Sequence, residues 1–154
     1  MTSGIEAIGP VDARRLAAWI AAIDFAEWPQ QSFAEIKPAM VTDLAWHGFG
    51  LVSDPVVADV MAEHFVGLAH EQHMLSVVMP GHSIRPHRDL QPRHWRCRVH
   101  VPLLSNDQSV FVSNGVPHAL VPGMAYSVDT RIEHSISNDG DTPRIHFMFD
   151  VREA

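Results

Sequence analysis

The sequence predicts a mainly β protein, an antiparallel sandwich or barrel, with helices in its N-terminal part. A change of period is the first observation behind this prediction. Apolar residues recur at helical spacing up to about residue 73 and alternate from Met74 onward. The second is the Gly, Pro and Asn punctuation of the alternating part, which is typical of short strands joined by turns. We expect one domain over residues 1–154, mostly helical over 1–73 and with its β core over 74–151.

Two helices are expected in the first part of the chain. Asp12 is a suitable N-cap for a helix over 13–24. Asp54-Pro55 provides a cap followed by proline at the first turn, for a helix over 55–73. Residues 28–50 contain two prolines and two glycines, so we expect a loop there with one short strand.

The expected strands alternate in polarity. They lie within 74–79, 96–103, 110–112, 124–128 and 144–151. Side chains at i and i+2 share a strand face, so Arg98 lies beside His100, and Arg144 beside His146. Antiparallel core strands rarely carry Arg and His on a buried face. These two faces are therefore expected to line a polar cavity inside the barrel, which indicates a ligand site.

Composition limits the classes of function. The formal net charge of −7 argues against a nucleic-acid or anionic-membrane partner. Cys97 is the only cysteine, so no internal disulfide can form, in keeping with a reducing compartment. No basic segment followed by a long apolar run opens the chain, and no apolar stretch approaches about 20 residues. These features predict a cytoplasmic enzyme.

Four residues in the second half carry the strongest chemical signal. His87 and Asp89 form an H-x-D pair, His134 lies far downstream, and Arg144 follows ten positions later. Two histidines and one carboxylate can bind one face of a non-haem Fe(II) and leave the other sites open. An arginine can clamp a carboxylate through two parallel hydrogen bonds. The set predicts an Fe(II) oxygenase that uses a 2-oxo acid.

Structural interpretations of the same residues stay open. His87 and Asp89 can be surface residues after a turn, and His134 a hydrogen-bonded core histidine. Arg144 can be an ion-pair partner at the end of a hairpin. The polar residues 138–141 predict such a hairpin, which would also bring Arg144 back beside His134. The polar strand faces can also hold an interior network that binds no ligand.

Four blocks of the second half stand in a particular order and spacing. They are 76–87 (SVVMPGHSIRPH), 96–103 (RCRVHVPL), 122–129 (PGMAYSVD) and 134–151, which contains His134, Asn138, Arg144-Ile145-His146 and Phe149-Asp150-Val151. Together they resemble the aspartyl/asparaginyl β-hydroxylase family of Fe(II)- and 2-oxoglutarate-dependent oxygenases. The resemblance covers about half of the chain. It implies a double-stranded β-helix, a jelly-roll of two sheets with the iron between them.

The resemblance also implies a ligand set for the metal. His87 and His134 would bind Fe(II). Animal members of the family often have glycine where Asp89 stands, so this chain looks like the members with a complete triad. Asp150 and Asp129 lie near strand ends and are candidates for supporting a histidine ligand.

For the co-substrate, the resemblance implies that Arg144, helped by Ser76, holds the distal carboxylate of 2-oxoglutarate. Arg98 and His100 would meet the carboxylate end near the metal. One departure from the family is a gap between His87 and Arg98 that is two residues longer, which affects the expected position of Arg98.

The expected reaction is the hydroxylation of a C–H bond with O2. The family allows free amino acids, small peptides, carrier-bound acyl groups and protein side chains. The small size of the chain favours a small amino-acid-like molecule, and arginines near the metal blocks favour one that carries a carboxylate. Two other functions compete: a cupin-like metalloenzyme that uses O2 without 2-oxoglutarate, and a non-catalytic binding module. The complete ligand set argues against the binding module.

Overall fold

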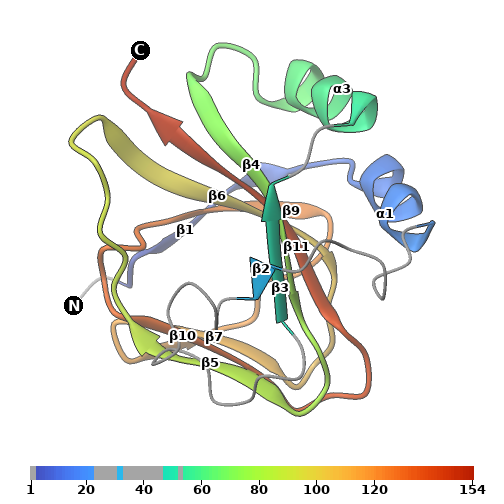
Figure 1. Cartoon of the computed structure of the whole chain (residues 1–154), viewed down its shortest axis with the longest axis vertical. Coiled ribbons are helices and arrows are strands. Elements are labelled where there is room, and N and C mark those ends of the chain that lie inside the picture. The colour runs from blue at the N-terminus through green and yellow to red at the C-terminus, as the bar shows by residue number, and fades with distance from the viewer. Residues whose placement is uncertain (1–2, 23–30, 33–46, 52–53) are drawn as a thin grey trace.

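The computed structural model describes residues 3–22, 31–32, 47–51 and 54–154 (Figure 1). Most of the loop expected over 28–50 lies outside these residues. In chain order the elements are β1 (Ile5–Pro10), α1 (Arg14–Ala21), β2 (Gln31–Ser32), β3 (His47–Leu51), α3 (Pro55–His64), β4 (His70–Val78), β5 (His82–His87), β6 (Trp95–Leu104), β7 (Ser109–Ser113), β8 (Val116–His118), β9 (Met124–Val128), β10 (His134–Asn138) and β11 (Arg144–Arg152). None of the described helices is long and apolar enough to cross a membrane.

The strands form two antiparallel sheets. The larger has the order β1-β9-β6-β11-β4-β3-β2, and the smaller has the order β5-β10-β7-β8. Figure 1 shows both helices on the side of the larger sheet that faces away from the smaller one. This is the jelly-roll arrangement that the resemblance implies, and each of the five expected strands is present.

The two faces of the larger sheet differ in chemistry, as the alternation predicts. On the outer face, Val99, Val101 and Phe147 pack against Leu16 of α1 and Val60 of α3. The residues between them in sequence point into the space between the sheets. Side-chain alternation therefore separates a hydrophobic core from a polar interior within the same strands.

The helix predictions are right at the start of α3 and wrong at its end. The Asp54 carboxylate accepts a hydrogen bond from the Val56 amide at 3.0 Å, with Pro55 in the first turn, as a proline-containing N-cap requires. The helix ends at His64 rather than near residue 73. Phe65 is the C-cap, and two residues later Gly67 adopts φ +86°, a left-handed conformation in which a helix cannot continue, before the chain enters β4 at His70.

The N-terminal part of the chain also differs from the expectation. Ala13, not Asp12, is the N-cap of α1. The Asp12 carboxylate still accepts from the backbone amide of Arg14 at 3.1 Å, and it accepts from the Arg14 side chain at 2.7 and 2.9 Å. Residues 5–10 form β1 at the edge of the sheet, paired with β9, where a mostly helical segment is expected. Its residues alternate poorly, because an edge strand is partly solvated on both faces.

The expected hairpin between β10 and β11 is absent, since the two strands lie in different sheets. The polar segment after β10 instead crosses from one sheet to the other. Asn138 fixes the crossing, because its side-chain amide donates to the carbonyls of Val78 at 2.8 Å and Thr142 at 2.9 Å. Arg144 nevertheless reaches the same interior as His134, from the opposite wall.

Candidate metal centre

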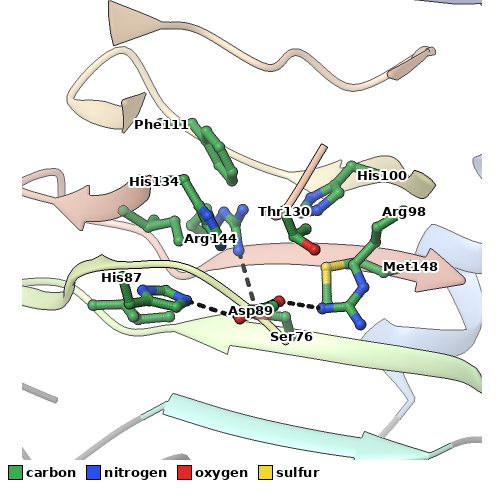
Figure 2. Close-up of a pocket in the computed structure, with 12 residues that line it drawn as sticks. Ser76, His87, Asp89, Arg98, His100, Phe111, Thr130, His134, Arg144 and Met148 are labelled. Carbon is green, nitrogen blue, oxygen red and sulfur yellow. Dashed lines mark hydrogen bonds and ion pairs between the residues drawn. The ribbon is translucent and has the colours of Figure 1, made fainter. Parts of the chain in front are cut away.

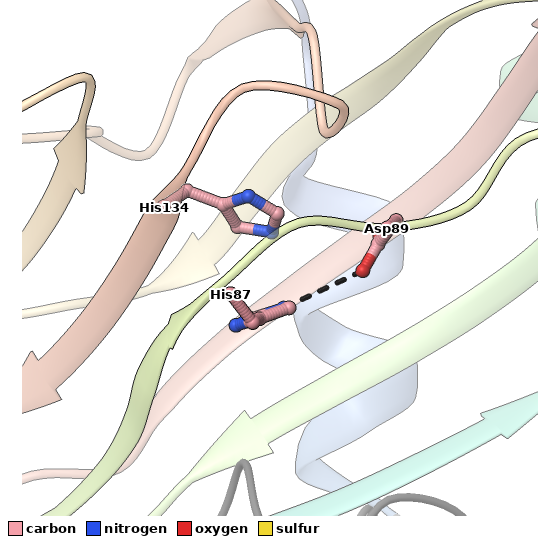
Figure 3. Close-up of side chains that lie close together, drawn as sticks. All are labelled: His87, Asp89 and His134. Carbon is pink, nitrogen blue, oxygen red and sulfur yellow. Dashed lines mark ion pairs between the residues drawn. The ribbon is translucent and has the colours of Figure 1, made fainter.

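Three ligand-type side chains meet at the open end of the smaller sheet (Figure 3). His87 ends β5, Asp89 follows two positions later, and His134 begins β10. The strand register places His134 directly opposite His87. One ligand atom from each residue lies within 4.8 Å of the others. The backbone pairing of two strands therefore brings together residues that are far apart in sequence.

Each histidine is held in the tautomer that metal binding needs. Nδ1 of His87 lies 2.7 Å from the carbonyl of Arg85, and Nδ1 of His134 lies 2.9 Å from the carbonyl of Ile132. A carbonyl can only accept, so each Nδ1–H donates and each Nε2 keeps its lone pair. Burial lowers the pKa of His134, which favours the neutral ring. Metal-bound histidines are oriented by the same kind of outer hydrogen bond.

The Asp89 carboxylate has two different environments. Its Oδ1 lies 3.5 Å from Nε2 of His87, on the side where the histidine nitrogens converge. Its Oδ2 accepts from Nη1 of Arg98 at 3.2 Å. The Asp89 amide donates to the carbonyl of Thr130 at 2.9 Å, which anchors the backbone after β5. One oxygen is therefore available to a cation, and the other has a partner.

Neither Asp150 nor Asp129 supports a histidine, so that expectation is wrong. Asp150 pairs with Arg98, its cross-strand neighbour, at 2.8 and 3.1 Å. Asp129 accepts from Arg131 at 2.9 Å. Backbone carbonyls, rather than carboxylates, take the outer nitrogens of the two ligand histidines.

Arg144 is the buried cation of the opposite wall. It is 2 % exposed, and its Nη1 donates to Oγ of Ser76 at 3.3 Å. Its Nη2 is buried and has no hydrogen-bond partner among the described residues. Burial lowers its pKa to about 9. A buried guanidinium in this state is a strong site for an anion.

A buried histidine pair lies near Arg144. Nδ1 of His100 and Nδ1 of His146 are 3.0 Å apart, so one ring donates to the other. Burial, together with the positive charge of Arg144, holds the pKa of both rings well below the usual value. The two rings are neutral and form the interior polar contact that the strand alternation allows.

One cavity joins the histidine–aspartate cluster to Arg144 (Figure 2). All seven residues expected at the site line it: Ser76, His87, Asp89, Arg98, His100, His134 and Arg144. Five others line it without having been singled out by the sequence: Ile84, Phe111, Thr130, Ile136 and Met148. Phe111 stacks on the His134 ring, with centroids 5.8 Å apart. The apolar liners carry no chemical signal of their own, although Phe111 alternates with Ser109 and Ser113.

The fold and this site define a class, the jelly-roll metal-dependent oxygenases. The family model of aspartyl/asparaginyl β-hydroxylases matches residues 51–154. The chain therefore belongs to the aspartyl/asparaginyl β-hydroxylase family. The identified resemblance is thus confirmed, and with it the class of enzyme: an Fe(II)- and 2-oxoglutarate-dependent hydroxylase. No curated protein matches the chain.

Solved structures share the fold at low sequence identity. A viral collagen prolyl hydroxylase from Paramecium bursaria Chlorella virus-1, solved with 2-oxoglutarate, is 11% identical, with TM-score 0.67 over 98% of this chain and 97% of that one. AviO1 from Streptomyces viridochromogenes is 15% identical, with TM-score 0.63 over 98% and 90%. A Pseudomonas putida prolyl-4-hydroxylase is 14% identical, with TM-score 0.61 over 99% and 94%. These similarities show a common architecture.

Proposed function

We propose that this protein hydroxylates a C–H bond of a small, amino-acid-like substrate that carries a carboxylate. In this proposal His87, Asp89 and His134 hold Fe(II), and Arg144 with Ser76 holds the distal carboxylate of 2-oxoglutarate. The observation that carries the proposal is the buried Nη2 of Arg144, which has no partner among the described residues. Arg144 lines the same cavity as His87, Asp89 and His134. A cupin-like oxygenase without 2-oxoglutarate has no need of such a cation.

The donor set fits Fe(II). Two imidazole nitrogens and one carboxylate oxygen, without thiolate, suit a non-haem iron better than a structural zinc. The tautomers of His87 and His134 are fixed, so neither ring must reorient when a cation binds. One face of the metal is left to the cavity, where co-substrate and O2 can bind.

The opposite end of the cavity fits a dicarboxylate. Arg144 and Ser76 offer a guanidinium and a hydroxyl to one carboxylate, while the metal side can take the 2-oxo acid group. We propose that His100 and the remaining N–H donors of Arg98 contact the carboxylate nearest the metal. Apolar neighbours such as Phe111 and Met148 exclude water from the space between the two ends.

When bound, Fe(II) and 2-oxoglutarate supply the oxidative chemistry: 2-oxoglutarate and O2 yield succinate and CO2, and one oxygen atom enters the substrate C–H bond. The residues of this chain supply placement. Arg144 fixes the co-substrate by its far end, so its reactive end is held at the metal. Neutral His134 remains a ligand at physiological pH because burial lowers its pKa.

The preference for a carboxylate substrate rests on positive charge close to the proposed ligands in sequence, because Arg88 stands between His87 and Asp89 although it does not line the cavity. Arg88 follows the ligand His87, is exposed, and donates to the carbonyl of Arg131 at 3.5 Å, so that contact does not neutralise its charge. A cation at this position attracts an anionic molecule toward the metal. We further propose a single catalytic domain in the cytoplasm that does not bind nucleic acid, which the lone Cys97 and the net charge of −7 support.

The test is succinate formation from 2-oxoglutarate with Fe(II), measured with a panel of amino acids and their carboxamides. The proposal predicts that some free amino acids stimulate succinate release and that their carboxamides do so much less. Arg88→Gln should raise KM for the stimulating amino acid, whereas Arg14→Gln, a matched change of an arginine in the helical layer, should not. Equal stimulation by acids and amides would refute the carboxylate preference.

A further inference from the structure

We propose that Asp150 is a positioning residue for the metal carboxylate. It holds Arg98 along one edge, so that Arg98 presents a single donor to the outer oxygen of Asp89 and leaves the inner oxygen to the metal. This inference rests on the proposed function, because it takes Asp89 as a metal ligand. It gives Asp150 a role at the metal centre through Arg98, without contact with the metal or the substrate.

The Arg98–Asp150 pair is built into the sheet. The two residues stand directly opposite each other on β6 and β11. Nε of Arg98 donates to Oδ1 of Asp150 at 2.8 Å, and Nη2 donates to Oδ2 at 3.1 Å. Two parallel hydrogen bonds from a planar guanidinium fix its orientation as well as its position. Asp150 is 5 % exposed, so solvent does not compete strongly for its oxygens.

This orientation determines what Arg98 offers to Asp89. With Nε and Nη2 on Asp150, the far nitrogen Nη1 points to Asp89 and donates to Oδ2 at 3.2 Å. The other oxygen of Asp89, Oδ1, faces Nε2 of His87 at 3.5 Å. A chain of contacts therefore runs from Asp150 through Arg98 to Asp89, and it distinguishes the two oxygens of the ligand carboxylate.

Electrostatics explains why the second aspartate is needed. A guanidinium that faced Asp89 alone would form a two-bond ion pair with both of its oxygens and compete directly with the metal. Asp150 occupies the bidentate edge of Arg98 and shares its positive charge. Asp89 thus keeps one oxygen free for the cation while the other is held in place, which is the function of outer-shell partners in metal sites.

The experiment is a Co(II) titration of the apo-protein, followed by visible absorption, with the Tm of each apo-protein recorded in parallel. Asp150→Asn should weaken Co(II) binding by about 10-fold or more, the usual effect of losing an outer-shell partner. Glu71→Gln is the control, because Glu71 faces Asp150 across β4 and β11 and pairs with His94 rather than Arg98. The control should bind Co(II) as the wild type does.

An unchanged Co(II) affinity in folded Asp150→Asn would overturn the inference, as would an equal loss in Glu71→Gln. If Asp150→Asn does not fold, a crystal structure of the wild type with Mn(II) decides. The inference requires Asp89 to bind through one oxygen with Arg98 still on Asp150; a two-oxygen Asp89 ligand, or Arg98 detached from Asp150, would refute it. Failure of the wild type to bind any divalent metal would instead refute the proposed function.

Discussion

The two faces of the larger sheet bury side chains of opposite chemistry, although they belong to the same strands. On the outer face, Phe147 and Val101 are fully buried in the hydrophobic core between the sheet and the helices. On the inner face, Arg144 and His100 are equally buried but carry a charge or polar nitrogens. Burial of apolar groups stabilises the fold, whereas burial of an unpaired cation costs stability. The difference indicates that the inner face is built for a ligand.

The largest expected effect comes from removing a metal ligand on the inner side. His134→Ala should abolish hydroxylase activity and reduce Fe(II) affinity at least about 100-fold, because two of three protein ligands cannot hold the metal face. The apo-protein should stay folded, since the loss creates space in a cavity rather than in the core. Metal analysis measures iron binding, and circular dichroism checks that the variant is folded. Wild-type iron affinity in this variant would show that His134 is not a ligand.

A substitution on the outer face should lower stability and leave metal binding intact. Phe147→Ala removes a fully buried ring from the core between sheet and helices and should cost about 3–5 kcal/mol of the free energy of unfolding. The fraction that remains folded should bind Fe(II) with nearly wild-type affinity, because the ring points away from the cavity. Chemical denaturation measures the first effect and metal titration the second. Loss of metal affinity in the folded fraction would break the separation of the two faces.

Replacement of Arg144 separates stability from binding, because it should raise the Tm of the apo-protein and weaken the binding of 2-oxoglutarate. Arg144→Met replaces a buried cation whose Nη2 lacks a partner among the described residues with an apolar side chain of similar length. The Tm of the apo-protein should rise, as buried charges often cost more than apolar replacements. The affinity for 2-oxoglutarate should fall about 100-fold, in line with loss of charge-assisted hydrogen bonds. Isothermal titration of the metal-loaded variant with 2-oxoglutarate measures this affinity, and a value equal to that of the wild type would contradict the role of Arg144.

The smallest expected effect is on pH dependence. The pKa of His100 and that of His146 are held well below 6.5 in the folded protein by burial. The unfolded chain then binds more protons below about pH 6.5, so the stability of the apo-protein is greatest above that pH and falls as the medium is acidified. The slope should approach about 1.4 kcal/mol per pH unit for each ring. His146→Asn should make the slope shallower in denaturation curves between pH 5 and 7, and an identical slope would contradict the assignment.

The strand faces and the ligand cluster could be predicted from the sequence, because both follow from periodicity and motif spacing. Alternation on β6 and β11 placed Arg98, His100 and Arg144 on the inner face, and the H-x-D pair with a distant histidine predicted the cluster at the sheet end. Local signals were likewise sufficient for the Asp54 cap of α3. Each of these depends on neighbours within a few positions or on chemical types that are rare in a core.

Pairing between distant residues was not predictable from one sequence. The Arg98–Asp150 contact depends on the register of β6 against β11, which neither strand encodes alone. The chain after Asn138 resembles a hairpin turn, yet the next strand joins the other sheet. Residues 70–73 follow directly on an apolar stripe typical of a helix, and only the pairing of this segment with β11 makes it part of a strand. In each case tertiary contacts override a local preference.

The most direct test of the metal and co-substrate assignment is an anaerobic titration of the apo-protein with Fe(II), with and without 2-oxoglutarate. We expect a weak visible charge-transfer band that appears only when both are present, and that is lost in Arg144→Met although Fe(II) still binds. Fe(II) binding without such a band in the wild type would contradict the role of Arg144 and favour an oxygenase that does not use 2-oxoglutarate.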